Sequence, residues 1–188
     1  MSLTEKDKQF LLKLSRKALE HILKTGEELS VKDSDIPKKY KEKKATFVTL
    51  TNNGALRGCI GKLVPQIELY RDIIENTYSA AFNDPRFPQL TKEELDGIRI
   101  EISILSEPKA YKRTSPEALI EFLSKDKPGV ILEMGFHSAT YLPQVWEEVD
   151  NPEEFLSSLC LKAGLPQDMW KKENVKISTY SVMKFKEK

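Results

Sequence analysis

The feature that most constrains the fold is a nine-residue stretch in the middle of the chain, GIRIEISIL at 97–105. Four isoleucines alternate there with polar residues: Ile98, Ile100, Ile102 and Ile104 against Arg99, Glu101 and Ser103. Successive side chains of a strand point to opposite faces, so this alternation predicts a strand with one buried face. Strands of this kind are typical of antiparallel sheets.

The remaining patterns mix helices and strands without a regular βαβ repeat. Helical spacing of apolar residues predicts helices at 4–25, from Pro65 to the Asn-Asp-Pro stop at 83–85, from Ser115, and at 152–163. Strands are predicted at 46–51, 55–62, around the turn at 135–138, and at 175–185. Residues 27–45 are polar and are expected to form a solvated linker. The fold class is therefore expected to be α+β, with a mainly antiparallel sheet flanked by helices.

Composition excludes several classes of protein. The 188 residues carry a net charge of only +1, which does not support nucleic-acid binding. The two cysteines form no CxxC pair, and we expect neither a metal site nor a cofactor. No apolar run is long enough for a membrane span, so we expect a cytoplasmic protein without membrane contact. The length suits one domain over 1–188, built as two closely packed subdomains.

The segment LRGCIG at 56–61 contains most of the candidate functional residues. On a strand, Arg57 and Cys59 lie on one face, where a guanidinium favours the thiolate form of a cysteine. Gly58 and Gly61 allow another group to approach the backbone, or mark a bulge or tight helix packing. A two-residue turn at Asn53-Gly54 pairs Val48 with Cys59 and favours burial of the thiol, whereas a bulge shifts the register.

The same segment carries a family resemblance. LRGCIG is the signature hexapeptide of the AMMECR domain family. Three further blocks resemble that family in the same order along the chain: AAFNDPRFPQLTKEEL at 80–95, IRIEISIL at 98–105 and ATYLPQVWEE at 139–148. The resemblance spans roughly residues 5–185. It implies an α+β fold with a larger and a smaller subdomain, an unsettled biochemical activity, and an association with Memo-type and radical SAM proteins in a modification pathway.

Three hypotheses for function follow. In the first, a cleft between the subdomains holds a site for group transfer or modification, with Cys59 as nucleophile and His137 as candidate base. The substrate is then contacted by Leu56, Arg57, Gly58, Ile60, Gly61, Asp84 and Arg86. In the second, the glycine-rich segment is a non-catalytic binding surface for a protein or peptide. A third reading, RNA binding or modification, relies on the lysine-rich run at 38–44.

Overall fold

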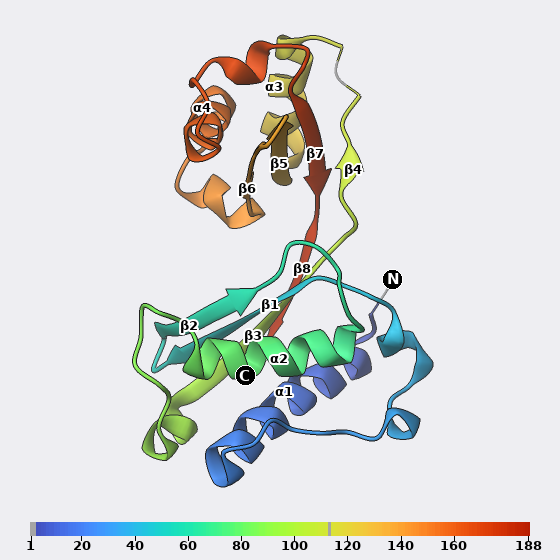
Figure 1. The fold of residues 1–188 in the computed structure, drawn as a ribbon, viewed down its shortest axis with the longest axis vertical. Helices are drawn as coiled ribbons and strands as arrows, with labels where there is room; N and C mark the ends of the chain where they lie inside the picture. Colours follow the sequence, from blue (N-terminus) through green and yellow to red (C-terminus); the bar gives the residue numbers. More distant parts are fainter. Residues whose placement is uncertain (1–2, 113) are drawn as a thin grey trace. The chain divides into compact units, whose positions relative to one another are not determined.

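The computed structural model describes residues 3–112 and 114–188 and divides into two compact units (Figure 1). The first unit consists of the chain up to residue 105 together with residues 183–188. The second unit, residues 106–182, is inserted between two strands of the first. None of the helices in the described residues combines the length and apolar character needed to cross a bilayer.

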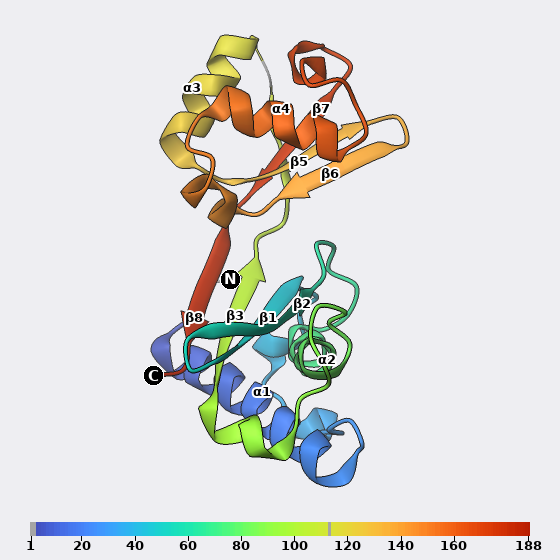
Figure 2. The same cartoon turned by 90° about the vertical axis from the view of Figure 1, so that its left-hand side faces the viewer.

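The first unit is a four-stranded sheet with two helices on one face (Figures 1 and 2). Its elements are α1 (Glu5–Thr25), β1 (Thr46–Asn52), β2 (Ala55–Gly61), α2 (Leu69–Phe82), a 3₁₀ helix (Lys92–Gly97), β3 (Ile98–Leu105) and β8 (Val182–Lys186). The strand order is β2-β1-β3-β8, and β1 is antiparallel to both β2 and β3. One of the two edge strands of the sheet is therefore β2, which carries the LRGCIG segment.

The core of the first unit lies between the sheet and the two helices. The isoleucines at 98, 100, 102 and 104 are all buried, as the alternation predicted, and lie beside buried Val48 and Leu50 of β1. Thr4 caps α1 through a capping box with Asp7, and Gly26 ends the helix in the left-handed conformation. The sequence therefore predicted the limits of α1 correctly.

The segment that precedes α2 differs from the prediction. The helix begins at Leu69 rather than at Pro65. Glu68 is held in an extended conformation by a β-bridge to Lys43, and the Leu69 amide donates to the Glu42 carbonyl at 2.9 Å. These tertiary hydrogen bonds override the local preference of proline for a first helical turn.

Residues 27–45 are also more structured than a solvated linker. They contain two short 3₁₀ helices (Asp33–Asp35 and Lys38–Lys41). Leu29, Ile36 and Tyr40 insert their side chains into the core of the first unit. Of the lysines at 38–44, Lys39 pairs with Asp7, Lys41 with Asp33 and Lys44 with Glu42. This pairing removes much of the positive charge on which an RNA-binding surface would depend.

The second unit is a smaller antiparallel sheet covered by helices (Figure 2). Its elements are β4 (Lys109–Ala110), α3 (Pro116–Asp126), β5 (Gly129–Met134), β6 (His137–Tyr141), a 3₁₀ helix (Pro143–Glu147), α4 (Pro152–Lys162), a second 3₁₀ helix (Met169–Lys171) and β7 (Lys176–Tyr180). The strand order is β4-β7-β5-β6, and every neighbouring pair is antiparallel. Phe155, Cys160 and Trp170 are fully or almost fully buried in its core.

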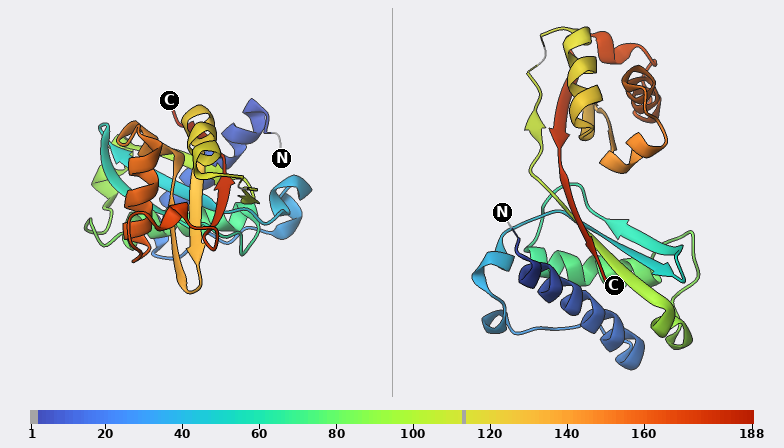
Figure 3. Two further views of the ribbon diagram at one scale, coloured as in Figure 1. Left: turned by 90° about the horizontal axis from the view of Figure 1, so that it is seen from above. Right: turned by 180° about the vertical axis from the view of Figure 1, so that it is seen from behind.

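One predicted strand proved to be two. The stretch expected at 175–185 divides at Ser181 into β7 and β8, which belong to different sheets (Figure 3). The break occurs where the chain leaves the second unit, and the Ser106 amide donates to the Ser181 carbonyl at 2.9 Å. The predicted α+β class with antiparallel sheets is confirmed, with two sheets in place of one.

Candidate functional site

The register of the β1–β2 hairpin places Cys59 beside Thr49. Asn53 and Gly54 form the expected turn with positive φ values of 49° and 85°. A bulge follows, so that Leu50 pairs with Gly58 but Thr51 pairs with Leu56, leaving one extra residue on β2. The pairing of Val48 with Cys59 is therefore wrong, and the bulge alternative is confirmed.

The extra residue on β2 is Arg57, and it forms an ion pair within the chain. Its Nε donates to Glu94 Oε1 at 2.6 Å and its Nη2 donates to Glu94 Oε2 at 3.1 Å. The Arg57 hydrogen bond is the main reason why the pKa of Glu94 falls to about 2. Arg57 is buried, and its guanidinium also lies 6.0 Å from the centre of the Phe87 ring. Glu94 therefore already pairs with Arg57, the residue that the sequence analysis assigned to contact with a substrate.

Asp84 and Arg86 clamp the peptide of Cys59 from the open edge of the sheet. Asp84 Oδ2 accepts from the Cys59 amide at 2.8 Å, and Arg86 Nη2 donates to the Cys59 carbonyl at 3.3 Å. Asp84 is buried, and its carboxylate also accepts from Arg86 Nη2 at 2.7 Å and Nε at 2.9 Å. Hydrogen bonding to Arg86 holds the pKa of Asp84 well below its usual range. The loop at 84–86 therefore does meet the LRGCIG segment.

This clamp acts in place of a neighbouring strand. An edge strand presents free amide and carbonyl groups that invite pairing with another chain. At Cys59 both groups are satisfied by side chains, because the carboxylate of Asp84 supplies the acceptor and the guanidinium of Arg86 supplies the donor. The arrangement fixes the backbone under the thiol and blocks strand addition at this position.

Both glycines of the segment face the protein's own backbone. A Cβ added to Gly58 would lie 2.0 Å from the Ala80 carbonyl oxygen on α2. A Cβ added to Gly61 would lie 2.3 Å from the Thr46 carbonyl oxygen on β1. The close approach that these glycines allow is thus helix and strand packing, the structural alternative for Gly residues in a strand.

The two apolar residues of the segment differ in exposure. Ile60 is partly buried and packs against the core of the first unit. Leu56, in contrast, is 45 % exposed. Of the apolar residues in the segment, Leu56 is therefore the one that remains free to contact a partner.

Residue Cys59 is partly exposed, whereas Cys160 is fully buried. The Cys59 Sγ lies 3.1 Å from Thr49 Oγ1 on the neighbouring strand, a hydrogen bond in which either atom can donate. The pKa of Arg86 is raised mainly by its hydrogen bond with Asp84. Arg86 Nη2 also donates to the Cys59 carbonyl, so the guanidinium lies beside the backbone of the residue that carries the thiol.

His137 belongs to the second unit and lies at the start of β6, one residue beyond the turn at Gly135 and Phe136. Its Nδ1 is 2.9 Å from the Ala163 carbonyl oxygen. A carbonyl oxygen only accepts, so Nδ1 carries the proton and Nε2 is the free acceptor in the neutral ring. A partnership between His137 and Cys59 stays a prediction.

A buried polar cluster on α2 was missed by the sequence analysis. Asp72 is fully buried, and its Oδ2 accepts from the Thr46 amide at 2.9 Å, the Thr46 hydroxyl at 2.6 Å and Asn76 Nδ2 at 2.9 Å. Lys62 lies 3.3 Å from the other carboxylate oxygen, and burial raises the pKa of Asp72. The apolar periodicity of α2 gave no signal for it, because Asp72 lies on the side of the helix opposite Tyr70, Ile73 and Ile74. The cluster ties the start of β1 to the helix.

Metal binding finds no support in the described side chains. Within residues 3–112 and 114–188, no three His, Cys, Asp or Glu residues gather in a way that could hold an ion. The chemistry available at the site is instead that of a thiol, a hydroxyl and a guanidinium, supplied by Cys59, Thr49 and Arg86.

Comparison with known proteins gives a consistent result over nearly the whole chain. A protein from Pyrococcus abyssi is 39 % identical, with 95 % of this chain and 89 % of the relative covered. A protein from Methanocaldococcus jannaschii is also 39 % identical, with 98 % and 92 % covered. The crystal structure of an uncharacterized protein from Pyrococcus horikoshii matches with a TM-score of 0.81 at 38 % identity, covering 95 % of this chain and 90 % of that one. The pattern that describes the AMMECR1 family matches residues 12–185, and the chain belongs to that family.

Proposed function

We propose that the protein acts through the thiol of Cys59, as a nucleophile or transient carrier in a group-transfer or modification reaction. The observation that carries the proposal is a partly exposed cysteine on an edge strand, whose amide and carbonyl groups are both held by the side chains of Asp84 and Arg86. Rigid positioning of a reactive group lowers the entropic cost of reaching the transition state. A cysteine that served only as a small core residue would not need to be exposed.

The proposed step is attack of the Cys59 thiolate on an electrophilic carbon of an activated donor. The bond from Sγ to that carbon forms, the bond from the carbon to the leaving group breaks, and the leaving group departs with the electron pair. The thiol proton passes to solvent before the attack. A nucleophile on the acceptor then takes the group from sulfur, which leaves as thiolate, so the cysteine is regenerated.

Two neighbours support this chemistry. Thr49 Oγ1, 3.1 Å from Sγ, donates its hydroxyl proton to the thiolate. Arg86 is paired with Asp84 and lies beside the Cys59 backbone, and its side chain is 54 % exposed, so its guanidinium can reach an anionic donor and stabilise the charge that develops during transfer. Asp84 is a positioning residue, because it holds both the Cys59 amide and the Arg86 guanidinium. The family's association with Memo-type and radical SAM proteins makes a modification pathway the proposed setting.

A second candidate function is binding of a protein or peptide without chemistry. It is favoured by the 45 % exposure of Leu56 on the edge strand and by the partly exposed Phe87, whose ring lies 6.0 Å from the guanidinium of the adjacent Arg57. Exposed apolar side chains can mark interaction sites, and aromatic residues are enriched at protein interfaces. In this alternative the thiol of Cys59 is dispensable, and Leu56 is the essential residue.

Alkylation kinetics on the native protein test the first candidate. Iodoacetamide is added at neutral pH and the modification of each cysteine is followed by mass spectrometry, with buried Cys160 as the internal reference and glutathione as the free-thiol reference. We expect Cys59 to react faster than glutathione. The variants Thr49→Val and Arg86→Gln should each slow the reaction several-fold, because they remove a group that stabilises the thiolate.

The outcomes separate the two candidates. A Cys59 that is modified only after unfolding refutes the nucleophile proposal. A Cys59 that reacts no faster than glutathione, and equally in both variants, also refutes it and leaves the binding candidate. The binding candidate is then tested by comparing Leu56→Ser with Cys59→Ser for recovery of a partner protein, and it requires that only the first substitution abolishes the interaction.

A further inference from the structure

A cavity of about 480 Å³ lies against α1 in the first unit. One wall is α1 and the other is the segment at 30–36 that follows it. Phe10, Leu14, Val31 and Ile36 supply its apolar surface. A volume of this size is in the range of sites for small organic molecules.

The helical wall is a continuous face of α1. Phe10, Lys13, Leu14 and Lys17 have the spacing i, i+3, i+4, i+7, which places all four on one side of a helix. Leu14 is buried at the base, whereas Lys13 and Lys17 are exposed. The cavity therefore has an apolar base and cations at its mouth.

The base of the cavity is preformed. The Phe10 ring stacks on Tyr40 with 4.8 Å between ring centres and 10° between planes. The Tyr40 hydroxyl donates to Asp7 Oδ1 at 2.7 Å, and Asp7 also pairs with Lys39. Because Phe10 is fixed by this chain of contacts, a ligand would lose little free energy in ordering the site.

The mouth of the cavity has an excess of positive charge. Lys13, Lys17 and Lys32 line it, and in the described part of the chain these three ammonium groups have no carboxylate partner. Asp35 is the one acidic residue among the lining side chains, and its Oδ1 accepts a hydrogen bond from Ser34. Three cations face one carboxylate, so the mouth favours an anion.

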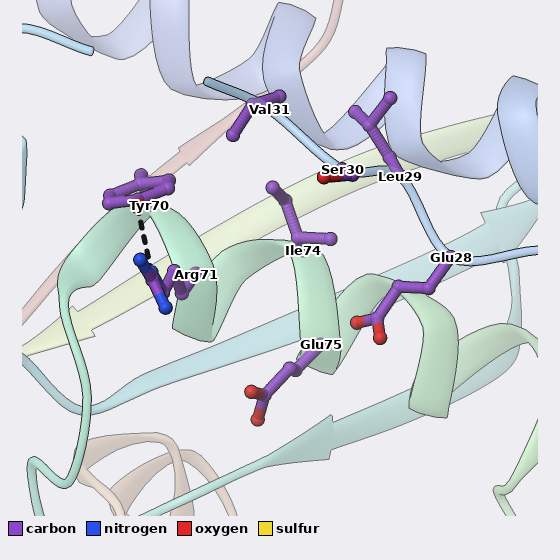
Figure 4. A pocket seen from close by; sticks show the side chains of 8 residues that line it. All are labelled: Glu28, Leu29, Ser30, Val31, Tyr70, Arg71, Ile74 and Glu75. Atoms are coloured by element: carbon purple, nitrogen blue, oxygen red, sulfur yellow. Dashed lines mark hydrogen bonds between the residues drawn. The ribbon is translucent and has the colours of Figure 1, made fainter. Parts of the chain in front are cut away.

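A neighbouring cavity lacks such an excess of positive charge. It measures about 240 Å³, shares Ser30 and Val31 with the first, and is bordered by Glu28 and Glu75 (Figure 4). Its one cation among the lining side chains, Arg71, donates from Nε to the Tyr70 hydroxyl at 2.7 Å, the dashed line in Figure 4. Glu75 is paired with Lys62 at 2.6 Å. An anion is therefore favoured on the side of the 30–31 segment that carries the three lysines.

We propose that the cavity between α1 and residues 30–36 binds a small organic anion that has an apolar ring or short chain. The apolar part lies on Phe10 and Leu14, and the anionic group is held by Lys13, Lys17 and Lys32. This site is separate from Cys59, whose thiol hydrogen-bonds Thr49 on the sheet. Its occupancy does not depend on the function proposed for Cys59.

Binding of naphthalene-2-sulfonate, compared with the uncharged naphthalene-2-sulfonamide, tests the proposal. Amide chemical shifts of ¹⁵N-labelled protein locate the bound probe and give its dissociation constant. We expect shifts at Phe10, Leu14, Val31 and Ile36 with the sulfonate. The double variant Lys13→Gln/Lys17→Gln should weaken sulfonate binding about tenfold, as expected for two solvent-exposed ion pairs, and leave the sulfonamide unchanged.

Three matched controls complete the experiment. Lys24→Gln removes a cation from α1 outside the cavity and should leave sulfonate binding unchanged, as should Glu28→Gln in the neighbouring cavity. Cys59→Ser should also leave it unchanged, so a failure of the thiol proposal does not affect this result. Equal affinity of the sulfonate for the wild type and the double lysine variant would overturn the proposal, as would shifts confined to residues away from this cavity.

Discussion

Replacing Gly58 with alanine is a direct test of how closely α2 packs on β2. The new Cβ would lie 2.0 Å from the Ala80 carbonyl oxygen and 3.0 Å from its carbonyl carbon. Ordinary contacts between such atoms are longer by roughly 1 Å or more. The obstructing atoms belong to the helix backbone, so no side-chain rotation can relieve the clash, and α2 must move away from the sheet.

Two opposing contributions set the change in the free energy of unfolding caused by Gly58→Ala. Inserting a methyl group into a packed interface typically costs about 1–3 kcal/mol. Gly58 does not have a positive φ, so alanine introduces no backbone strain, and the smaller entropy of the unfolded chain returns about 0.4–1 kcal/mol. The expected net loss in the free energy of unfolding is therefore about 1–2 kcal/mol, and valine should cost more.

Urea unfolding followed by far-UV circular dichroism measures this loss. Both tryptophans, Trp146 and Trp170, lie in the second unit, so tryptophan fluorescence reports that unit separately. Amide hydrogen exchange then assigns the lost stability to α2 and β2. The control is Ala55→Val on the exposed end of the same strand, expected to change stability by less than about 0.5 kcal/mol. A Gly58→Ala variant as stable as the wild type would refute the close packing of α2 on β2.

Three further predictions concern the ion pairs of the site and the second core. The Glu94 carboxylate stabilises the fold above its ordinary pKa of 4.5, and this contribution is lost as the pH falls through about 2. Arg57→Met should abolish it, and acid titration of both proteins followed by circular dichroism checks this. Identical acid transitions would contradict the prediction. Asp84→Asn should destabilise by about 1–3 kcal/mol in urea, because it weakens the charge-assisted hydrogen bonds that the buried carboxylate accepts from the Cys59 amide and from Arg86, and an unchanged midpoint would contradict the clamp. Phe155→Ala should cost about 3–5 kcal/mol in the second unit, because its ring is buried, whereas Phe136→Ser, at a fully exposed turn, should change the fluorescence-monitored transition by less than about 0.5 kcal/mol.

The Gly58 clash also changes how the binding candidate can be tested. A bulky residue at Gly58 was the natural way to block a partner that lies on the glycine-rich segment. Because that residue would displace α2, a loss of binding would report misfolding as readily as a blocked surface. Leu56→Ser avoids the difficulty, since Leu56 is 45 % exposed and its replacement removes contact area without touching the core.

Much of the fold was predictable because its signals are local. Thr4 and Gly26 delimited α1, and the isoleucines of β3 identified the buried face of the sheet. Caps and alternation depend on neighbours within four residues, so the sequence displays them directly. The start of α2 and the division at Ser181 depend on hydrogen bonds to distant segments, and these have no local signal.

The candidate site was likewise predictable in part from the sequence, with its contacts decided by the tertiary structure. The sequence alone identified LRGCIG and the 84–86 loop as the segments of interest, because both lie in blocks that resemble the family. It could not assign partners, because Arg57 and Glu94 are 37 residues apart and Asp84 and Cys59 are 25 apart. In the structure Arg57 pairs with Glu94, whereas Arg86 pairs with Asp84 and donates to the Cys59 carbonyl.

The sequence by itself determined the elements, their buried faces, the α+β class and the family, all of which depend on the order of residues along short windows. Only the tertiary structure decided that Arg57 is neutralised by Glu94, that Gly58 and Gly61 accommodate the chain's own backbone, and that Cys59 is left partly exposed. The physical reason is that charge neutralisation and steric contact depend on distances of a few ångströms between atoms from different segments. Those distances are set by packing and strand register, where a shift of one residue exchanges the two faces of a strand.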